Sequence, residues 1–284
     1  MLKLLPPINN VIATGIATIA VELPGAGLHA LHFVLGGGAF TKAMIQNVEI
    51  KVGDRTLCDY STTATQLDDI NTWRGRPDTA SYLSFYFGAP EMVDFHDKHV
   101  SDLDLSVLRN KDGSQATLAI RMNIVGATTP SLICYADINP PKSTLKFPAG
   151  EIALVKALHP SVFTPSGAVV RQNYSVGLGK GGSAVVNEFW FNSKITSLLI
   201  EKNNITLLDD VASADLADFY ASNGRTAVAG MYAWSPTLEG FVGLAERTLM
   251  ADGSTPFPWQ HRVTTNGADT LTVLSEIITP FQLL

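Results

Sequence analysis

The chain has 284 residues, of which 46% are apolar and only 16% are charged, and its formal net charge is −6. The length suits two domains of ordinary size. The acidic balance, without a run of Lys or Arg, excludes a protein that mainly binds nucleic acid. The low share of charged residues indicates that other subunits cover much of the surface.

The N-terminal segment does not resemble a signal peptide, because Pro6 and Pro7 interrupt it after one Lys and a few leucines. The most apolar run, residues 11–23, is too short and too alternating for a transmembrane helix. Cys58 and Cys134 both fall in predicted strands, which favours free buried thiols over a disulfide framework. We therefore expect a soluble protein that is made in a reducing cytoplasm.

The first half of the chain has the pattern of short strands and one helix. Alternating apolar and polar residues predict half-buried strands, and the segment 28–35, apolar on both faces, predicts a central one. Thr63 and Gln66 have the spacing of a capping box, which predicts a helix to about Trp73. The expected strands span residues 19–23, 28–35, 48–52, 55–60, 82–87, 105–108, 117–125 and 132–138.

The tandem prolines Pro140 and Pro141 mark a domain boundary, because they cannot continue a strand ladder. We predict a first domain over residues 1–139, a linker over 140–150 and a second domain over 151–284. In the second domain, Ser213 is the expected N-cap of a helix around residues 214–222. Its expected strands span residues 151–158, 168–176, 184–191, 195–202, 205–208, 227–234, 241–249, 260–265 and 271–278.

The two halves repeat each other. The segment from Ile45 to Ile70 matches the segment from Ile195 to Phe219, with aligned residues 150 positions apart (195 − 45). Two further matches are 140 positions apart (252 − 112): Asp112-Gly113-Ser114 with Asp252-Gly253-Ser254, and Ile138-Asn139-Pro140 with Ile278-Thr279-Pro280. Unrelated β-rich stretches can share an alternating pattern, but the preserved order of strand, turn, strand and helix favours a duplication.

Many short strands joined by Gly, Pro and Asp turns predict a sandwich or a barrel. Eight strands, the number expected in the first repeat, are typical of a jelly roll, which has two sheets and Greek-key connections. The predicted fold is therefore all-β, with two tandem eight-stranded jelly-roll β-sandwiches, each carrying a short inserted helix.

The densest group of metal-ligand residue types comprises Asp94, His96, Asp97, His99, Asp102 and Asp104. The carboxylates of Asp94, Asp97, Asp102 and Asp104 suit calcium, whereas the two imidazoles could suit zinc. The segment lacks EF-hand spacing, and solvated loops without an ion often have this composition. We predict calcium at the four aspartates, with a metal-free loop as the alternative.

The sequence contains no arrangement typical of catalysis. In the glycine-rich segment 177–183, Gly181 follows Lys180, whereas a phosphate-binding loop needs Ser or Thr there. His159 and His261 are the only histidines of the second half, too few for the metal site of a cupin enzyme. We therefore expect that the protein is not an enzyme and needs no catalytic cofactor.

Two stretches carry a resemblance to a known family: Ile45–Leu57, and Tyr82–Phe87 followed by Pro90-Glu91-Met92. With the tandem plan, they resemble the double jelly-roll major capsid proteins of tailless, membrane-containing icosahedral bacteriophages, of the corticovirus type and the adenovirus-type lineage. The resemblance implies a coat protein whose homotrimers present six jelly rolls and tile an icosahedral shell around an internal membrane. Some family members bind calcium, but no residue here matches a calcium motif of the family.

The same resemblance implies a place in the virion and a set of partners. These are neighbouring trimers, other virion proteins such as the vertex protein, and the membrane by proximity, without nucleic acid. Broad, weakly charged side surfaces agree with such tiling.

A different function on the same fold is carbohydrate binding, by a tandem lectin or a virion spike. That function needs a concave site with aromatic and acidic residues in adjacent loops. Trp190 and Trp234 fall in predicted strands, so we expect them in the core or at an interface rather than against a sugar. A cupin-like enzyme, the third alternative, should hold a stoichiometric transition metal.

Overall fold

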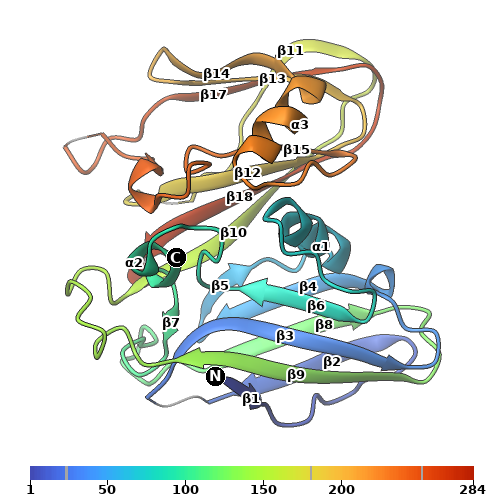
Figure 1. Ribbon diagram of the computed structural model, residues 1–284, viewed down its shortest axis with the longest axis vertical. Helices are drawn as coiled ribbons and strands as arrows, with labels where there is room; N and C mark the ends of the chain where they lie inside the picture. Colours follow the sequence, from blue (N-terminus) through green and yellow to red (C-terminus); the bar gives the residue numbers. More distant parts are fainter. Residues whose placement is uncertain (23–24, 180, 251) are drawn as a thin grey trace.

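The computed structural model describes residues 1–22, 25–179, 181–250 and 252–284. Leu23, expected in the first strand, and Lys180 of the glycine-rich segment lie outside the described residues. Strands dominate, and they form two jelly rolls that follow one another along the longest axis of the molecule (Figure 1). The predicted all-β fold with two tandem jelly rolls is confirmed.

The first jelly roll precedes the double proline. Its elements are β1 (Leu2–Leu4), β2 (Gly15–Val21), β3 (Gly27–Gly37), η1 (Lys42–Met44), β4 (Ile45–Val52), β5 (Arg55–Cys58), α1 (Ala64–Trp73), β6 (Tyr82–Tyr86), α2 (Phe95–His99), β7 (Leu103–Asp104), β8 (Leu118–Ile124) and β9 (Pro130–Asn139). One layer has the order β1-β9-β3-β6, with β7 beside β3, and the other has the order β5-β4-β8-β2.

The second jelly roll follows the same plan. Its elements are β10 (Leu154–Phe163), β11 (Val169–Tyr174), β12 (Ala184–Phe191), β13 (Ile195–Lys202), β14 (Ile205–Ala212), α3 (Ser213–Ser222), β15 (Met231–Trp234), η2 (Val242–Leu244), β16 (Glu246–Arg247), β17 (Trp259–Thr265), β18 (Leu271–Pro280) and η3 (Phe281–Leu283). Its layers have the orders β10-β18-β12-β15, with β16 beside β12, and β14-β13-β17-β11. Every strand of one jelly roll thus has a counterpart in the other.

Bulges in the ladders fall at matching positions. The bulge at Gln46 of β4 corresponds to the bulge at Thr196 of β13. The bulge at Leu57 of β5 corresponds to that at Leu207 of β14. Because a bulge marks one specific residue of a strand, the two coincidences confirm the predicted offset of 150 (196 − 46).

The downstream match is displaced by one residue from the predicted one. The bulges at His29 of β3 and Val186 of β12 are also counterparts. The residues just before these bulges, Leu28 and Val185, pair with Ile138 of β9 and Ile277 of β18. The offset in these strands is therefore 139 (277 − 138), and the predicted match of Ile138 with Ile278 is wrong. A one-residue shift in a strand exchanges its two faces, so the ladder decides this alignment.

Several predicted elements differ from the structure. Residues 105–108 form a turn rather than a strand, and the region 241–249 contains η2 and the short β16. Leu105 and Leu108 are buried without a ladder, so they gave the apolar pattern of a strand from within a turn. The strand β1 and the helix α2 were not predicted. Ser213 is the first residue of α3, and the N-cap is Ala212, which has no capping side chain.

Cys58 and Cys134 are buried free thiols, as predicted, and burial raises the pKa of each to about 12. The tryptophans Trp190 and Trp234 are buried, as expected for core residues. Among the described helices, none combines the length and the apolar character that crossing a membrane requires.

The two jelly rolls share one continuous sheet. The edge strand β5 of the first pairs in parallel with the edge strand β10 of the second, through Cys58 and Leu158. The joined sheet has the order β15-β12-β18-β10-β5-β4-β8-β2. Figure 1 shows α1 beside this junction, on the side of the first jelly roll that faces the second.

Candidate functional site

The first two predicted calcium ligands lie on α2, beside the junction of the jelly rolls. Asp94 is the N-cap of α2, and its Oδ1 accepts a hydrogen bond from the backbone N–H of His96 at 2.7 Å. Oδ2 of Asp97 accepts from the backbone N–H of Val242, in the second jelly roll, at 2.9 Å. Asp94, His96 and Asp97 offer possible ligand atoms within 4.8 Å of one another.

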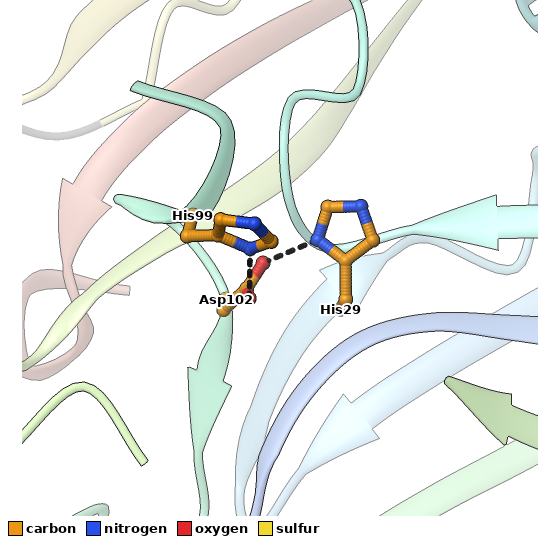
Figure 2. Close-up of side chains that lie close together, drawn as sticks. All are labelled: His29, His99 and Asp102. Carbon is orange, nitrogen blue, oxygen red and sulfur yellow. Dashed lines mark hydrogen bonds and ion pairs between the residues drawn. The ribbon is translucent and has the colours of Figure 1, made fainter. Parts of the chain in front are cut away.

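Asp102 lies between two histidines from distant parts of the chain (Figure 2). Its Oδ1 is 2.8 Å from Nδ1 of His29, and its Oδ2 is 2.8 Å from Nδ1 of His99. Oδ2 also accepts from the side-chain amide of Asn139 at 3.2 Å. Burial raises the pKa of Asp102, but the hydrogen bonds from both histidines lower it more, so this pKa lies below its usual range.

The bulge in β3 explains how His29 reaches Asp102. In a regular strand, residues three apart lie on opposite faces, and His32 does bond elsewhere, with its Nδ1 3.1 Å from the Ser84 hydroxyl. The bulge at His29 lies next to the position where α2 and β9 bring His99 and Asn139. Because β3 is buried on both faces, the bulge could not be recognised from an alternating pattern, and this group could not be predicted from sequence.

Asp104 belongs to neither group. Its Oδ1 accepts from the backbone N–H of Ser106 at 3.2 Å and from the Ser106 hydroxyl, and its Oδ2 accepts from the Ser143 hydroxyl at 3.4 Å. Among the described residues, the four predicted aspartates therefore occupy three separate places. Asp102 and Asp104 are buried and already bonded, whereas Asp94 is exposed and Asp97 half-buried.

The arrangement around Asp102 serves to connect segments. Each histidine Nδ1 bonds the carboxylate, and the two ring centroids lie 4.8 Å apart. The group ties β3, the end of α2 and the end of β9 together. A histidine–carboxylate pair becomes catalytic when it activates a nucleophile, and no Ser, Thr or Cys side chain is bonded to His29 or His99 in the described part of the chain.

A buried network of charges holds the two jelly rolls together. Arg74, the C-cap of α1, pairs with Glu276 of β18 and with Glu91, whose Oε1 is 3.3 Å from Arg74 Nε. Nζ of Lys156, on β10, is 3.0 Å from Oε1 of Glu276. All four side chains are at most 4% exposed. Removal of any one would leave an uncompensated buried charge, so the network fixes how the jelly rolls meet.

The cations in this network favour the ionised form of Glu276. Burial alone would raise the pKa of Glu276, but Arg74 and Lys156 outweigh this effect and lower the pKa to about 2. Next to the charges, Trp73 packs edge-on against Phe189 of β12, with ring centroids 5.3 Å apart. None of these residues was predicted as functional, because the partners come from distant parts of the chain.

The predicted linker is anchored at Lys142. Its Nζ donates to the carbonyl oxygens of Val100, Glu151 and Leu154 at 3.0, 3.1 and 2.8 Å. Burial lowers the pKa of Lys142 to about 8. Since Val100 follows α2 and Leu154 begins β10, this lysine ties the segment 140–150 to both jelly rolls.

Comparison with known proteins relates the chain to viral coats. Residues 2–139 match the family model described as Viral coat protein P2 N-terminal domain. Comparison with curated protein sequences gives no match. Among solved structures, the major capsid protein P2 from Bacteriophage PM2 is similar, with a TM-score of 0.79 and 17% identity over 98% of this chain and 97% of that one.

Two further capsid structures share the fold. The major capsid protein of Sulfolobus Turreted Icosahedral Virus has a TM-score of 0.64 and 12% identity, over 98% of this chain and 96% of that one. PBCV-1 VP54 has a TM-score of 0.59 and 11% identity, over 98% and 93%. At these identities the likeness concerns the fold, and it extends over both jelly rolls.

Proposed function

We propose that this chain, a double jelly-roll major capsid protein whose first half matches the viral coat protein P2 family, assembles into homotrimers of pseudo-hexagonal outline. The trimers tile an icosahedral shell around an internal membrane. The partners are neighbouring trimers, other virion proteins such as the vertex protein, and the membrane by proximity. The division into domains 1–139 and 151–284, with 140–150 between them, belongs to the same proposal.

The observation that carries the proposal is the pair of jelly rolls with one strand order, joined by a buried junction. Such a chain presents two similar blocks in a fixed relation. Three chains can then close a ring of six blocks with threefold symmetry and a nearly sixfold outline. Blocks of hexagonal outline tile a flat facet without gaps.

The surface supports burial by further subunits. Large apolar side chains are exposed on both jelly rolls, among them Leu2, Leu4, Ile133, Ile205 and Phe219. A soluble monomer with this surface would tend to aggregate, and closed symmetric contacts remove that tendency.

Sedimentation equilibrium of the purified protein at micromolar concentration tests the proposal. The expected mass is three times that of the 30.5 kDa chain, without dissociation on dilution through that range. A stable, soluble monomer that binds glycans would overturn the proposal in favour of a lectin or spike.

A further inference from the structure

The junction between the two jelly rolls is built from one edge and one face. The edge is β10, which pairs in parallel with β5. The face is the outer side of the β10-β18-β12 layer, where α1 brings Trp73 against Phe189 and Arg74 against Glu276. This contact shows how one copy of the repeat packs against the other.

The same edge and face exist a second time, at the opposite ends of the chain. The counterpart of β10 is β1, because Leu2 lies opposite Asp137 of β9 as Leu158 lies opposite Glu276 of β18. The counterpart of β5 is β14, by the shared bulges. In the described residues, β1 and β14 each end a sheet, with no strand on the outer side. Figure 1 shows them at opposite ends of the long axis.

Counterpart residues differ sharply in exposure. Leu158, at the junction, is 6% exposed, whereas its counterpart Leu2 is 62% exposed. Arg55 of β5 is 7% exposed, whereas its counterpart Ile205 of β14 is 63% exposed. Since the repeats share their fold, the exposed side chains of Leu2 and Ile205 lie at positions that a neighbouring jelly roll buries in the other repeat.

The helices α1 and α3 show the same difference in exposure. Each helix is followed by one further residue and then by a glycine of positive φ, Gly75 after α1 and Gly224 after α3. These glycines align the helices at an offset of 149 (224 − 75). Ile70 of α1 is then the counterpart of Phe219 of α3, and their exposures are 2% and 56%. The helix that would enter such a contact thus carries an exposed aromatic ring.

We infer that these two surfaces bind each other between copies of the chain. Strand β14 and helix α3 of one copy pack on β1 and the outer face of the β1-β9-β3-β6 layer of the next, and β14 pairs with β1 in parallel, as β5 pairs with β10. The contact joins two different surfaces, so it runs head to tail, and in the proposed trimer it closes after three copies. This inference rests on the proposed trimer and assigns the surfaces that form it.

The contact between copies is more apolar than the junction within a chain. The counterpart of Arg74 is Asn223, and that of Arg55 is Ile205. The charged network of the junction is therefore not repeated. Salt screens exposed charges but not apolar contacts, so the trimer should keep its mass in 1 M salt.

Paired charge substitutions test the assignment. Variant A carries Leu2→Asp and Leu4→Asp, and variant B carries Ile205→Asp and Phe219→Asp. The control is Val170→Asp, which changes an 81% exposed residue on β11, at the far edge of the layer that contains β14. In sedimentation, the control should be a trimer, and A and B should be monomers that keep the circular dichroism spectrum of the control, which shows that they are folded.

Mixing the variants tests the direction of the contact. A retains an intact β14–α3 surface and B retains an intact β1 surface, so an equimolar mixture should form one-to-one dimers that cannot close. A mixture that stays monomeric would overturn the head-to-tail assignment. If A and B remain trimers beside a trimeric wild type, the surfaces are wrong and the proposed function stands. A monomeric wild type would overturn the proposed function and the inference together.

Cross-linking tests the register without disturbing the fold. The pairing of Leu158 with Cys58 predicts that Leu2 of one copy lies opposite Leu208 of the next. Mild oxidation of the Leu2→Cys/Leu208→Cys variant should give covalently closed trimers, and neither single variant should cross-link. The native thiols are buried, with raised pKa values, and should not react. Absence of cross-links in a trimeric double variant would overturn the β14–β1 pairing.

Discussion

At the residue scale, the buried charges at the junction determine how the two jelly rolls are joined. Arg74 and Glu276 are 202 positions apart in the chain, and Lys156 adds a second cation beside the same carboxylate. Glu91 supplies the second negative charge. Such a network contributes less to net stability than apolar packing would, but it strongly disfavours any arrangement that separates its members.

Replacement of Glu276 by Gln should destabilise the protein by about 3–5 kcal/mol, because Arg74 and Lys156 would remain buried without their shared carboxylate. The measurement is the free energy of unfolding from urea titration. The control is Glu201→Gln, which breaks the partly exposed pair with Arg262 and should cost about 0–1 kcal/mol. Equal losses in the two variants would contradict the role given to the network.

Stability should fall in acid as Glu276 becomes protonated. Its pKa is lowered from 4.5 to about 2, so its contribution is present above pH 4.5 and is lost as the pH falls toward 2. The difference in urea midpoint between the wild type and Glu276→Gln should therefore shrink across that interval. A difference that stays constant from pH 5 to pH 2 would refute this account of the carboxylate.

Within the set of aspartates predicted to bind calcium, we propose Asp94 and Asp97 as the ligands, because neither side chain is buried and their carboxylates lie in one group. We expect a chelator to lower the melting temperature of assembled particles, because a cation would relieve the repulsion between neighbouring carboxylates. An Asp94→Asn/Asp97→Asn variant should lose this sensitivity, and an Asp112→Asn control should keep it. Wild-type particles that melt at the same temperature with and without chelator would remove the prediction.

The predicted metal set could not be resolved from sequence, because closeness along a chain does not decide where side chains point. Asp97 is turned toward Val242 of the second jelly roll, and Asp102 is turned toward His29. The junction could not be predicted either, since Arg74 and Glu276 have no local pattern that links them. The apolar positions were predictable, because alternation follows directly from strand geometry.

At the scale of elements, the duplication was the most informative feature of the sequence. The 150-residue offset held through both bulges of β4 and β5, whereas the match of short Ile-x-Pro stretches failed by one residue. A long aligned segment constrains register, and a three-residue likeness does not. Turns filled by buried residues, such as Leu105 and Leu108, were mistaken for a strand because burial alone gives the same apolar signal.

The two inserted helices differ in capping, and this difference can be measured. In α1, the Thr63 hydroxyl accepts from the Gln66 backbone N–H and the Gln66 side chain accepts from the Thr63 backbone N–H. Thr63→Ala should cost about 1 kcal/mol in unfolding free energy. Ser213→Ala, at the start of α3, should cost only a few tenths, since Ser213 is not the cap. Equal effects in the two variants would contradict the observed caps.

At the scale of the whole molecule, the chain forms one junction between its own two jelly rolls. The counterpart surfaces of that junction, on β1 and on β14, remain uncovered. The fold could be predicted from the pattern of the sequence, whereas a coat function was expected only from the resemblance of two stretches to a known family. The open surfaces could not be predicted, because only the structure shows which counterpart residues the inner junction buries. A head-to-tail contact that reproduces the inner junction would repeat one packing arrangement around the proposed ring of six jelly rolls.

Electron microscopy of the purified protein tests this central claim most directly. The account predicts single particles that average, along their main axis, to a nearly hexagonal outline of six density lobes with threefold symmetry. The lobes should alternate between the two jelly rolls of three chains. Averages with two lobes, as expected of a lone chain, or with twofold symmetry, as expected of a self-complementary dimer, would contradict it.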